Sequence, residues 1–201
     1  RIGVNAGSLD KELLARHGGP TAEAMVESAL GHIRILEDLD YREIKVSLKG
    51  SRVPQTVAAY RLLAERCDYP FHVGITEAGT VFRGAVKSAV GLGILLYLGL
   101  GDTLRVSLTG DPVREVEVGG WILRSLGLRK KGVEVISCPT CGRTRVDLVP
   151  IAEEVERRLA EVDASLTVAV MGCEVNGPGE ARGADLGVAC GKGVGLLFRR
   201  G

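Results

Sequence analysis

Short apolar stretches alternate with longer amphipathic stretches along the chain up to residue 126. The short stretches are rich in β-branched residues and cover residues 1–5, 44–49, 72–77 and 104–107. Segments with helical spacing of apolar positions begin after Pro20, with Thr21 as the expected N-cap, and cover residues 53–66, 83–100 and 112–126. Strands that alternate with helices in this way predict βα units on a parallel sheet.

Each of the four predicted strands ends on a polar or ionisable residue, namely Asn5, Lys49, Glu77 and Ser107. The C-terminal ends of the strands hold the active site in a β/α barrel. Strand ends are also polar simply because they meet solvent, but four in a row weaken that explanation. A closed barrel needs eight strands and typically ~250 residues. Because the chain also does not begin with Met, we expect part of a barrel rather than a smaller open sheet.

The character of the chain changes after residue 128. A short basic segment at 129–132 reads as a flexible junction, so we expect domains at 1–128 and 129–201. The second part predicts a strand at 133–137, a helix at 149–162, a strand at 166–171 and two short strands near Leu186 and Leu196. This pattern indicates a small α/β domain.

Composition excludes several classes of function. The chain has 201 residues and a formal net charge of +1, which gives no general nucleic-acid or membrane-binding surface. The longest apolar run, residues 89–101, is shorter than the roughly 20 residues of a membrane-spanning helix, so we expect a buried core helix there. Five cysteines, an odd number without a secretory signal, favour a reducing compartment over a disulfide framework.

Three cysteines follow predicted strands and are candidate metal ligands. Cys138 and Cys141 form a C-x-x-C pair, Cys173 follows the next strand, and Glu180 comes shortly after it. Three thiolates with one weaker oxygen ligand would suit an iron–sulfur cluster with one exchangeable iron. The C-x-x-C alone also suits a redox pair or half of a zinc site, and Cys190 could supply a fourth thiolate. No histidine follows residue 129 to complete a mixed zinc site.

Five motifs together resemble one family. They are RIGVNAGSL at 1–9, GITEAG at 74–79, GDTLRVS at 101–107, CPTC at 138–141 and NGPGE at 176–180. In order and spacing they are similar to the GcpE family, the 4-hydroxy-3-methylbut-2-enyl diphosphate synthases of the methylerythritol phosphate route to isoprenoids. The resemblance covers nearly the whole chain, but the first barrel strands of the family are absent.

The resemblance implies a fold and an activity. The expected fold is the C-terminal half of a TIM-type barrel followed by an iron–sulfur domain that resembles part of sulfite and nitrite reductases. The expected activity is the two-electron reductive ring opening and dehydration of 2-C-methyl-D-erythritol 2,4-cyclodiphosphate, with flavodoxin or ferredoxin as electron donor. Family members act as cytoplasmic homodimers in which one subunit's cluster domain closes over the other's barrel.

The resemblance also implies roles for individual residues. The [4Fe–4S] ligands are expected to be Cys138, Cys141, Cys173 and Glu180. Glu77 is the expected catalytic acid near the reacting carbons. The residues expected to bind substrate are Arg1, Asn5, Lys49, Arg105 and Ser107.

Other interpretations remain open on the sequence alone. Without the resemblance, Lys49 would be a solvated surface lysine and Arg105 part of a salt bridge in the barrel wall. A zinc-stabilised binding module that uses Cys190 as fourth ligand is the main alternative function. A flavin or haem enzyme has little support, because no G-x-G-x-x-G motif follows a predicted strand.

Overall fold

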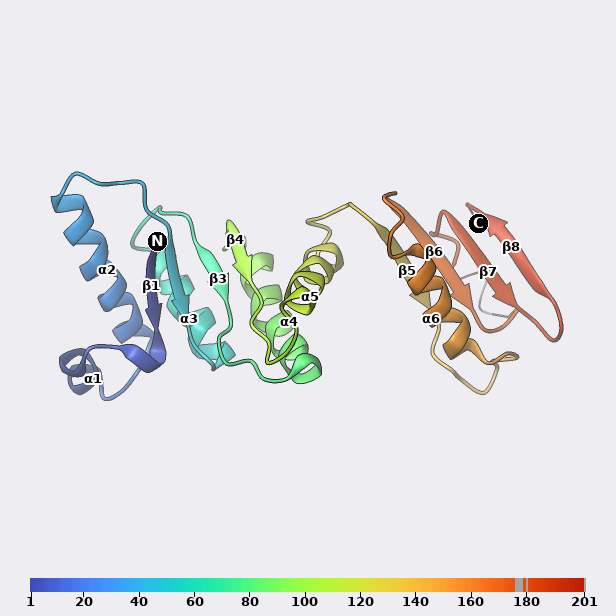
Figure 1. Cartoon of the computed structure of the whole chain (residues 1–201), viewed down its shortest axis with the longest axis horizontal. Helices are drawn as coiled ribbons and strands as arrows, with labels where there is room; N and C mark the ends of the chain where they lie inside the picture. Colours follow the sequence, from blue (N-terminus) through green and yellow to red (C-terminus); the bar gives the residue numbers. More distant parts are fainter. Residues whose placement is uncertain (176–178, 180, 201) are drawn as a thin grey trace. The chain divides into compact units, whose positions relative to one another are not determined.

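The computed structural model of the chain describes residues 1–175, 179 and 181–200. It divides into two compact units, Arg1–Arg129 and Lys130–Gly201. Both units are mixed α/β (Figure 1). Among the described residues, no helix has the length and hydropathy needed to cross a membrane.

Parallel strands form the centre of the first unit. Strand β1 (Ile2–Asn5) pairs with β2 (Val46–Lys49), and β3 (His72–Gly74) pairs with β4 (Thr103–Arg105). A single parallel bridge between Val46 and Phe71 places β3 beside β2, so the strand order follows the chain. The predicted strands at 72–77 and 104–107 are shorter than expected. Glu77 has a φ of 52°, a left-handed conformation that cannot continue a strand.

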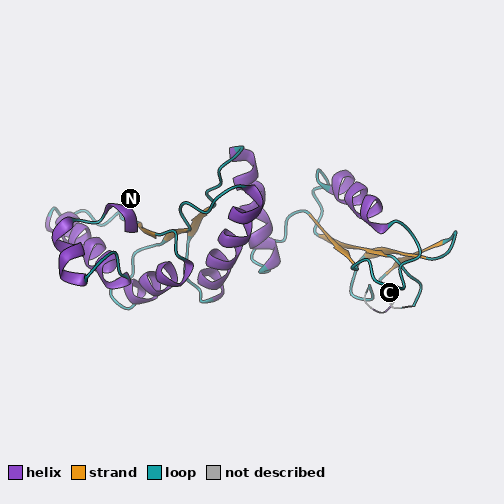
Figure 2. Cartoon of the chain, turned by 90° about the horizontal axis from the view of Figure 1, so that it is seen from below, coloured by secondary structure: helices purple, strands orange, loops and turns teal. Residues whose placement is uncertain are grey.

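Four predicted helices follow the strands, and each packs on the same side of them (Figure 2). They are α2 (Ala22–Asp38), α3 (Val53–Ala64), α4 (Val81–Tyr97) and α5 (Pro112–Ser125). The Thr21 side chain accepts a hydrogen bond from the backbone N–H of Ala24, as expected of an N-cap.

Two short helices before α2 were not predicted. They are η1 (Ala6–Ser8) and α1 (Lys11–His17), which Asp10 caps at its start and Gly18, at φ 68°, ends. An N-cap residue such as Asp at the start and a glycine just after the end are the sequence signals that predict such a helix.

Alternation along the strands separates two faces of the first unit. The apolar positions, among them Ile2, Val4, Val46, Leu48 and Val73, are buried against the helices and form the core. The intervening positions carry polar side chains or glycine and face away from the helices. The polar side chains are therefore positioned by a core that lies on the other side of the same strands.

Helix α4 differs from the expectation for the apolar run at 89–101. Only one side of it is buried, around Ser88, Leu92 and Leu95, while Val90 and Tyr97 are exposed. The expectation of a buried core helix thus holds for only one side of α4, because the helix has partners in the first unit only on its strand side and its two flanks.

The described residues of the second unit form a four-stranded sheet with a helix packed on it. The order is β5 (Val133–Ser137), β6 (Leu166–Met171), β7 (Leu186–Cys190) and β8 (Gly195–Arg199). The first three strands are parallel and β8 is antiparallel. Helix α6 (Leu148–Leu159) packs on β5 and β6. The predicted strands at 133–137 and 166–171 are confirmed with the same bounds.

Candidate functional site

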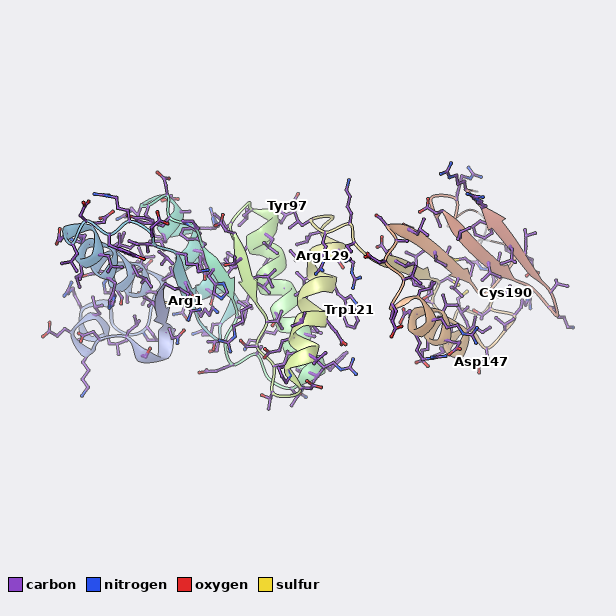
Figure 3. The ribbon with its side chains drawn as sticks, turned by 45° about the horizontal axis from the view of Figure 1, so that its top comes forward. Arg1, Tyr97, Trp121, Arg129, Asp147 and Cys190 are labelled. Atoms are coloured by element: carbon purple, nitrogen blue, oxygen red, sulfur yellow. The ribbon has the colours of Figure 1, made fainter. Side chains whose placement is uncertain are left out.

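A cationic face lies on the helix-free side of the strands in the first unit. In the strand register Asn5 pairs with Lys49, and Gly74 pairs with Arg105. Arg1 stands at the start of β1 (Figure 3). Three of the predicted substrate-binding residues, Asn5, Lys49 and Arg105, thus stand at the C-terminal ends of β1, β2 and β4.

Gly74 makes room for Lys49. A Cβ at Gly74 would lie 3.2 Å from Lys49 Cε and 2.7 Å from the carbonyl oxygen of Arg105. The Lys49 side chain therefore crosses directly over the glycine. Only 7% of Lys49 is exposed, so the alternative of a solvated surface lysine is wrong.

The charges on this face are uncompensated among the described residues. Burial, and then the nearby Arg105 and Arg1, lowers the pKa of Lys49 from 10.5 to about 8. None of these three side chains forms an ion pair in the described part of the chain, so the alternative of a salt bridge for Arg105 has no support there. Clustered cations without carboxylate partners are an arrangement that suits a multiply charged anion.

His72 belongs to the same face and was missed by sequence reasoning. Its Nδ1 lies 2.8 Å from Thr103 Oγ1 on β4. Burial, followed by Lys49, Arg1, Lys45 and Arg105, lowers the pKa of His72 to about 4, so the imidazole is neutral at pH 7. Its position two residues before Gly74, on the same side of β3, is the signal that would have found it.

A buried tyrosine fixes the two central strands beneath this face. The Tyr60 hydroxyl on α3 accepts a hydrogen bond from the backbone N–H of Leu48 at 2.9 Å and donates one to the carbonyl of His72 at 2.8 Å. It thereby joins β2 to β3, which share only one bridge. The position of Lys49 relative to His72 depends on this link.

Glu77 and Ser107 lie in loops beyond the strand ends. The Glu77 side chain is exposed, and its carbonyl accepts a hydrogen bond from Lys87 Nζ at 3.5 Å. In the described residues, no hydrogen bond or ion pair joins the Glu77 carboxylate to the cationic face. A bridge between Thr80 and Thr109 keeps the two loops side by side.

The second unit brings two cysteine loops to one edge of its sheet. Cys138 and Cys141 follow β5, and Cys173 follows β6. Since β5 and β6 are parallel neighbours, with Ser137 paired to Val170, their C-terminal ends meet at the same edge. The three cysteines are therefore on adjacent loops, as the sequence predicts.

Backbone hydrogen bonds tie these two loops together. The N–H of Gly172 donates to Cys138 Sγ at 3.2 Å, and the N–H of Arg145 donates to the carbonyl of Gly172 at 2.8 Å. The backbone N–H of Arg143, and then its side chain, lowers the pKa of the exposed Cys141 thiol. Donors that point at sulfur favour the thiolate, the form that binds metal.

The donor set fits an iron–sulfur cluster, because thiols are the normal ligands of such clusters and one of them already accepts a backbone N–H. Among the described residues, no group of three or more His, Cys, Asp or Glu side chains is assembled tightly enough to hold a metal ion. The predicted fourth ligand, Glu180, lies outside the described residues, as do Asn176, Gly177 and Pro178 of its motif.

Cys190 ends β7 (Figure 3) and is buried. Ala189 pairs with Met171, so alternation directs Cys190 to the opposite face of the sheet. Cys138 packs on the Met171 face. Burial, and then Cys138, raises the pKa of the Cys190 thiol. Its direction separates the Cys190 side chain from the face on which Cys138 packs, and its raised pKa disfavours the thiolate, the form that binds metal.

Comparison with known families agrees with this geometry. Residues 1–120 match the family described as GcpE TIM-barrel domain. Residues 134–201 match the GcpE protein C-terminal domain. The chain belongs to the GcpE family.

Curated GcpE relatives align along the whole chain. A protein from Geobacter sulfurreducens is 72% identical over 201 residues, all of this chain and 57% of the relative. One from Maridesulfovibrio salexigens is 65% identical over the whole chain and 56% of its own length. One from Clostridium acetobutylicum is 57% identical over the whole chain and 58% of its own length. All three are named 4-hydroxy-3-methylbut-2-en-1-yl diphosphate synthase (flavodoxin). The chain thus spans little more than half the length of these relatives.

Proposed function

We propose that the full-length protein is a 4-hydroxy-3-methylbut-2-enyl diphosphate synthase. It reduces 2-C-methyl-D-erythritol 2,4-cyclodiphosphate by two electrons, opening the ring and losing water, as a step of isoprenoid precursor biosynthesis. The observation that carries this proposal is the 72% identity, over all 201 residues, to a relative with that name.

The cationic face supports a cyclic diphosphate as substrate. Lys49, Arg105 and Arg1 are grouped without carboxylate partners in the described residues, and a diphosphate would neutralise them. Arg105 can bind two phosphate oxygens through its guanidinium, whereas Lys49 acts as a point charge. Asn5 and Ser107 add neutral hydrogen-bonding groups at the strand ends. These five residues are proposed to bind and orient the substrate.

Glu77 is proposed as the acid that protonates the departing hydroxyl. It lies three residues beyond Gly74, the last residue of β3. Its left-handed backbone, with φ at 52°, costs of order 1–3 kcal/mol for a residue other than glycine. Such backbone strain is concentrated at functional sites. The conformation therefore supports a functional role for Glu77.

The three cysteines Cys138, Cys141 and Cys173 are proposed to hold a [4Fe–4S] cluster together with Glu180. When bound, such a cluster supplies electrons one at a time and a Lewis-acidic iron. The chain contributes the thiolates, and its Gly172 N–H donates to one of their sulfurs. Hydrogen bonds to the sulfur ligands are one of the features that tune the potential of such a cluster.

The partners and the cellular setting follow from the same assignment. Flavodoxin, which the relatives' names mention, or ferredoxin is proposed as the electron donor. The full-length protein is proposed to be a cytoplasmic homodimer. Residues 1–128 are proposed as the C-terminal half of the barrel, and residues 129–201 as the cluster domain that resembles part of sulfite and nitrite reductases.

Turnover by the full-length protein tests the proposal. Anaerobically purified protein with dithionite and a redox mediator should convert the cyclic diphosphate to the allylic diphosphate. An Arg105→Lys variant should raise KM, because lysine cannot bind two phosphate oxygens at once. No conversion by a protein loaded with iron and sulfide would overturn the assignment. The comparisons give no support to the alternative of a zinc-stabilised binding module.

A further inference from the structure

Thr144 lies at the point where the two cysteine loops meet. It comes three residues after Cys141, and its backbone N–H donates a hydrogen bond to the Cys141 carbonyl at 3.0 Å. The next residue, Arg145, donates its backbone N–H to the carbonyl of Gly172 on the other loop at 2.8 Å. Backbone hydrogen bonds to both loops therefore fix the position of Thr144.

The Thr144 side chain lies against Gly172, the residue just before Cys173. A Cβ at Gly172 would be 2.9 Å from Thr144 Cγ2 and 3.5 Å from Thr144 Oγ1. The N–H of the same glycine donates to Cys138 Sγ at 3.2 Å. Thr144 is thus close to the loops of all three cysteines, because it follows Cys141 and adjoins the glycine that connects the other two.

The hydroxyl of Thr144 is buried and has no hydrogen-bond partner among the described residues. A threonine hydroxyl can donate one hydrogen bond, and leaving it buried without a partner is destabilising. Native structures therefore seldom keep such a group unless a ligand, ion or water pairs with it. A water does not fit between this side chain and Gly172, where even a methyl group would be only 2.9 Å from Thr144.

The nearby acceptor is the sulfur of Cys141. The backbone N–H of Arg143, then the Arg143 side chain and then the Thr144 hydroxyl lower the pKa of this thiol. The hydroxyl therefore lies beside the sulfur, although no hydrogen bond joins the two. A thiolate accepts hydrogen bonds better than a thiol does, since it carries a full negative charge. The hydroxyl would gain a partner when Cys141 becomes a thiolate ligand.

We propose that Thr144 tunes the iron–sulfur cluster by donating a hydrogen bond from its hydroxyl to the Cys141 thiolate ligand. This inference rests on the proposed function, because it requires the cluster that Cys138, Cys141 and Cys173 are proposed to hold. An O–H donor places partial positive charge next to the sulfur. It stabilises the reduced cluster, which carries one more electron, more than the oxidised cluster. Thr144 therefore raises the reduction potential of the cluster.

A redox titration of the reconstituted full-length protein, followed by electron paramagnetic resonance, tests this role. Thr144→Val keeps the shape of the side chain and removes the donor. It should lower the equilibrium constant for one-electron reduction of the cluster about tenfold, which is a midpoint ~59 mV lower. Thr144→Ser keeps the hydroxyl and should keep the wild-type midpoint. Thr167→Val is the matched control, because Thr167 is near the start of β6, at the end of the strand away from Cys173.

Iron content and circular dichroism keep the outcomes distinct. A lower midpoint in Thr144→Val, with wild-type iron content and dichroism, supports the proposal. If valine prevents folding, Thr144→Ala and Thr144→Ser both lack the methyl group and differ in the hydroxyl, so the alanine variant alone should have the lower midpoint. A wild-type midpoint in Thr144→Val, or equal shifts in the valine and serine variants, would overturn the proposal and leave the proposed function intact. A wild-type protein that takes up no cluster would contradict both.

Discussion

Replacing Lys49 with Met should stabilise the fold while weakening anion binding. Lys49 is 7% exposed and forms no ion pair among the described residues. Its ammonium group is held near Arg105 and Arg1, which are also positive. Methionine keeps an unbranched side chain over Gly74 and removes the charge. The cost of burying an unpaired ammonium then disappears from the folded state.

The lowered pKa of Lys49 sets the magnitude. It falls from 10.5 to about 8, and one pH unit corresponds to ~1.36 kcal/mol, so the charged form costs the fold at most about 3 kcal/mol. Lys49→Met should therefore raise the free energy of unfolding by about 1–3 kcal/mol at pH 7. Both folded and unfolded states are protonated below pH 8, so the full cost is present there. As the pH rises from 8 to 10.5, the folded state loses its proton first, and the gap between variant and wild type should close.

Urea unfolding of the full-length protein, followed by circular dichroism at pH 7 and pH 10, measures this gap. Inorganic pyrophosphate should stabilise wild type by RT ln(1 + [L]/Kd) and stabilise Lys49→Met much less. Lys45→Met is the control, because Lys45 is exposed and precedes β2. A Lys49→Met protein that is less stable than wild type at pH 7, or a gap that does not change with pH, would refute the reasoning.

Three further predictions concern the strands and the cysteine loops. Tyr60→Phe should destabilise the protein by about 1–3 kcal/mol in urea unfolding, since the backbone N–H of Leu48 and the carbonyl of His72 lose a buried partner; an unchanged midpoint would contradict this. The His72 ring should show no NMR titration between pH 5.5 and 8, because its pKa lies near 4, and pyrophosphate should raise that pKa; a midpoint near 6.5 without ligand would contradict it. Gly172→Ala would place a Cβ 2.9 Å from a side-chain carbon of the neighbouring loop, and should reduce iron uptake on reconstitution. The control Gly142→Ala meets no atom within 4 Å and should load normally.

The sequence predicted most of the strand framework of both units. The reason is that β-branched runs and helix caps are local signals, such as the Thr21 cap that begins α2. The strands at 133–137 and 166–171 have the predicted bounds because both are short runs rich in β-branched residues, and they pair in a parallel sheet. The end of the strand predicted at 72–77 was placed three residues too late. The left-handed backbone of Glu77, which cannot continue a strand, cannot be recognised from its residue type.

The candidate sites were predicted less completely. Lys49 and the three cysteines stand at strand ends, and parallel pairing brings such ends together. His72 was missed, because the pattern marks it only as a polar position on the Gly74 side of β3 and does not show its contact with Thr103 on β4. The exposed side of α4 was not predicted, because an apolar run alone does not tell which side of a helix packs on a partner.

The metal content of the full-length protein tests the central claim most directly. Protein purified without oxygen and reconstituted with iron and sulfide should bind about four of each per chain, as a [4Fe–4S] cluster requires. Cys173→Ser should lose the cluster, whereas Cys190→Ser should keep it, because Cys190 faces the other side of the sheet. One tightly bound zinc, lost in Cys190→Ser and accompanied by no uptake of iron or sulfide, would contradict the account.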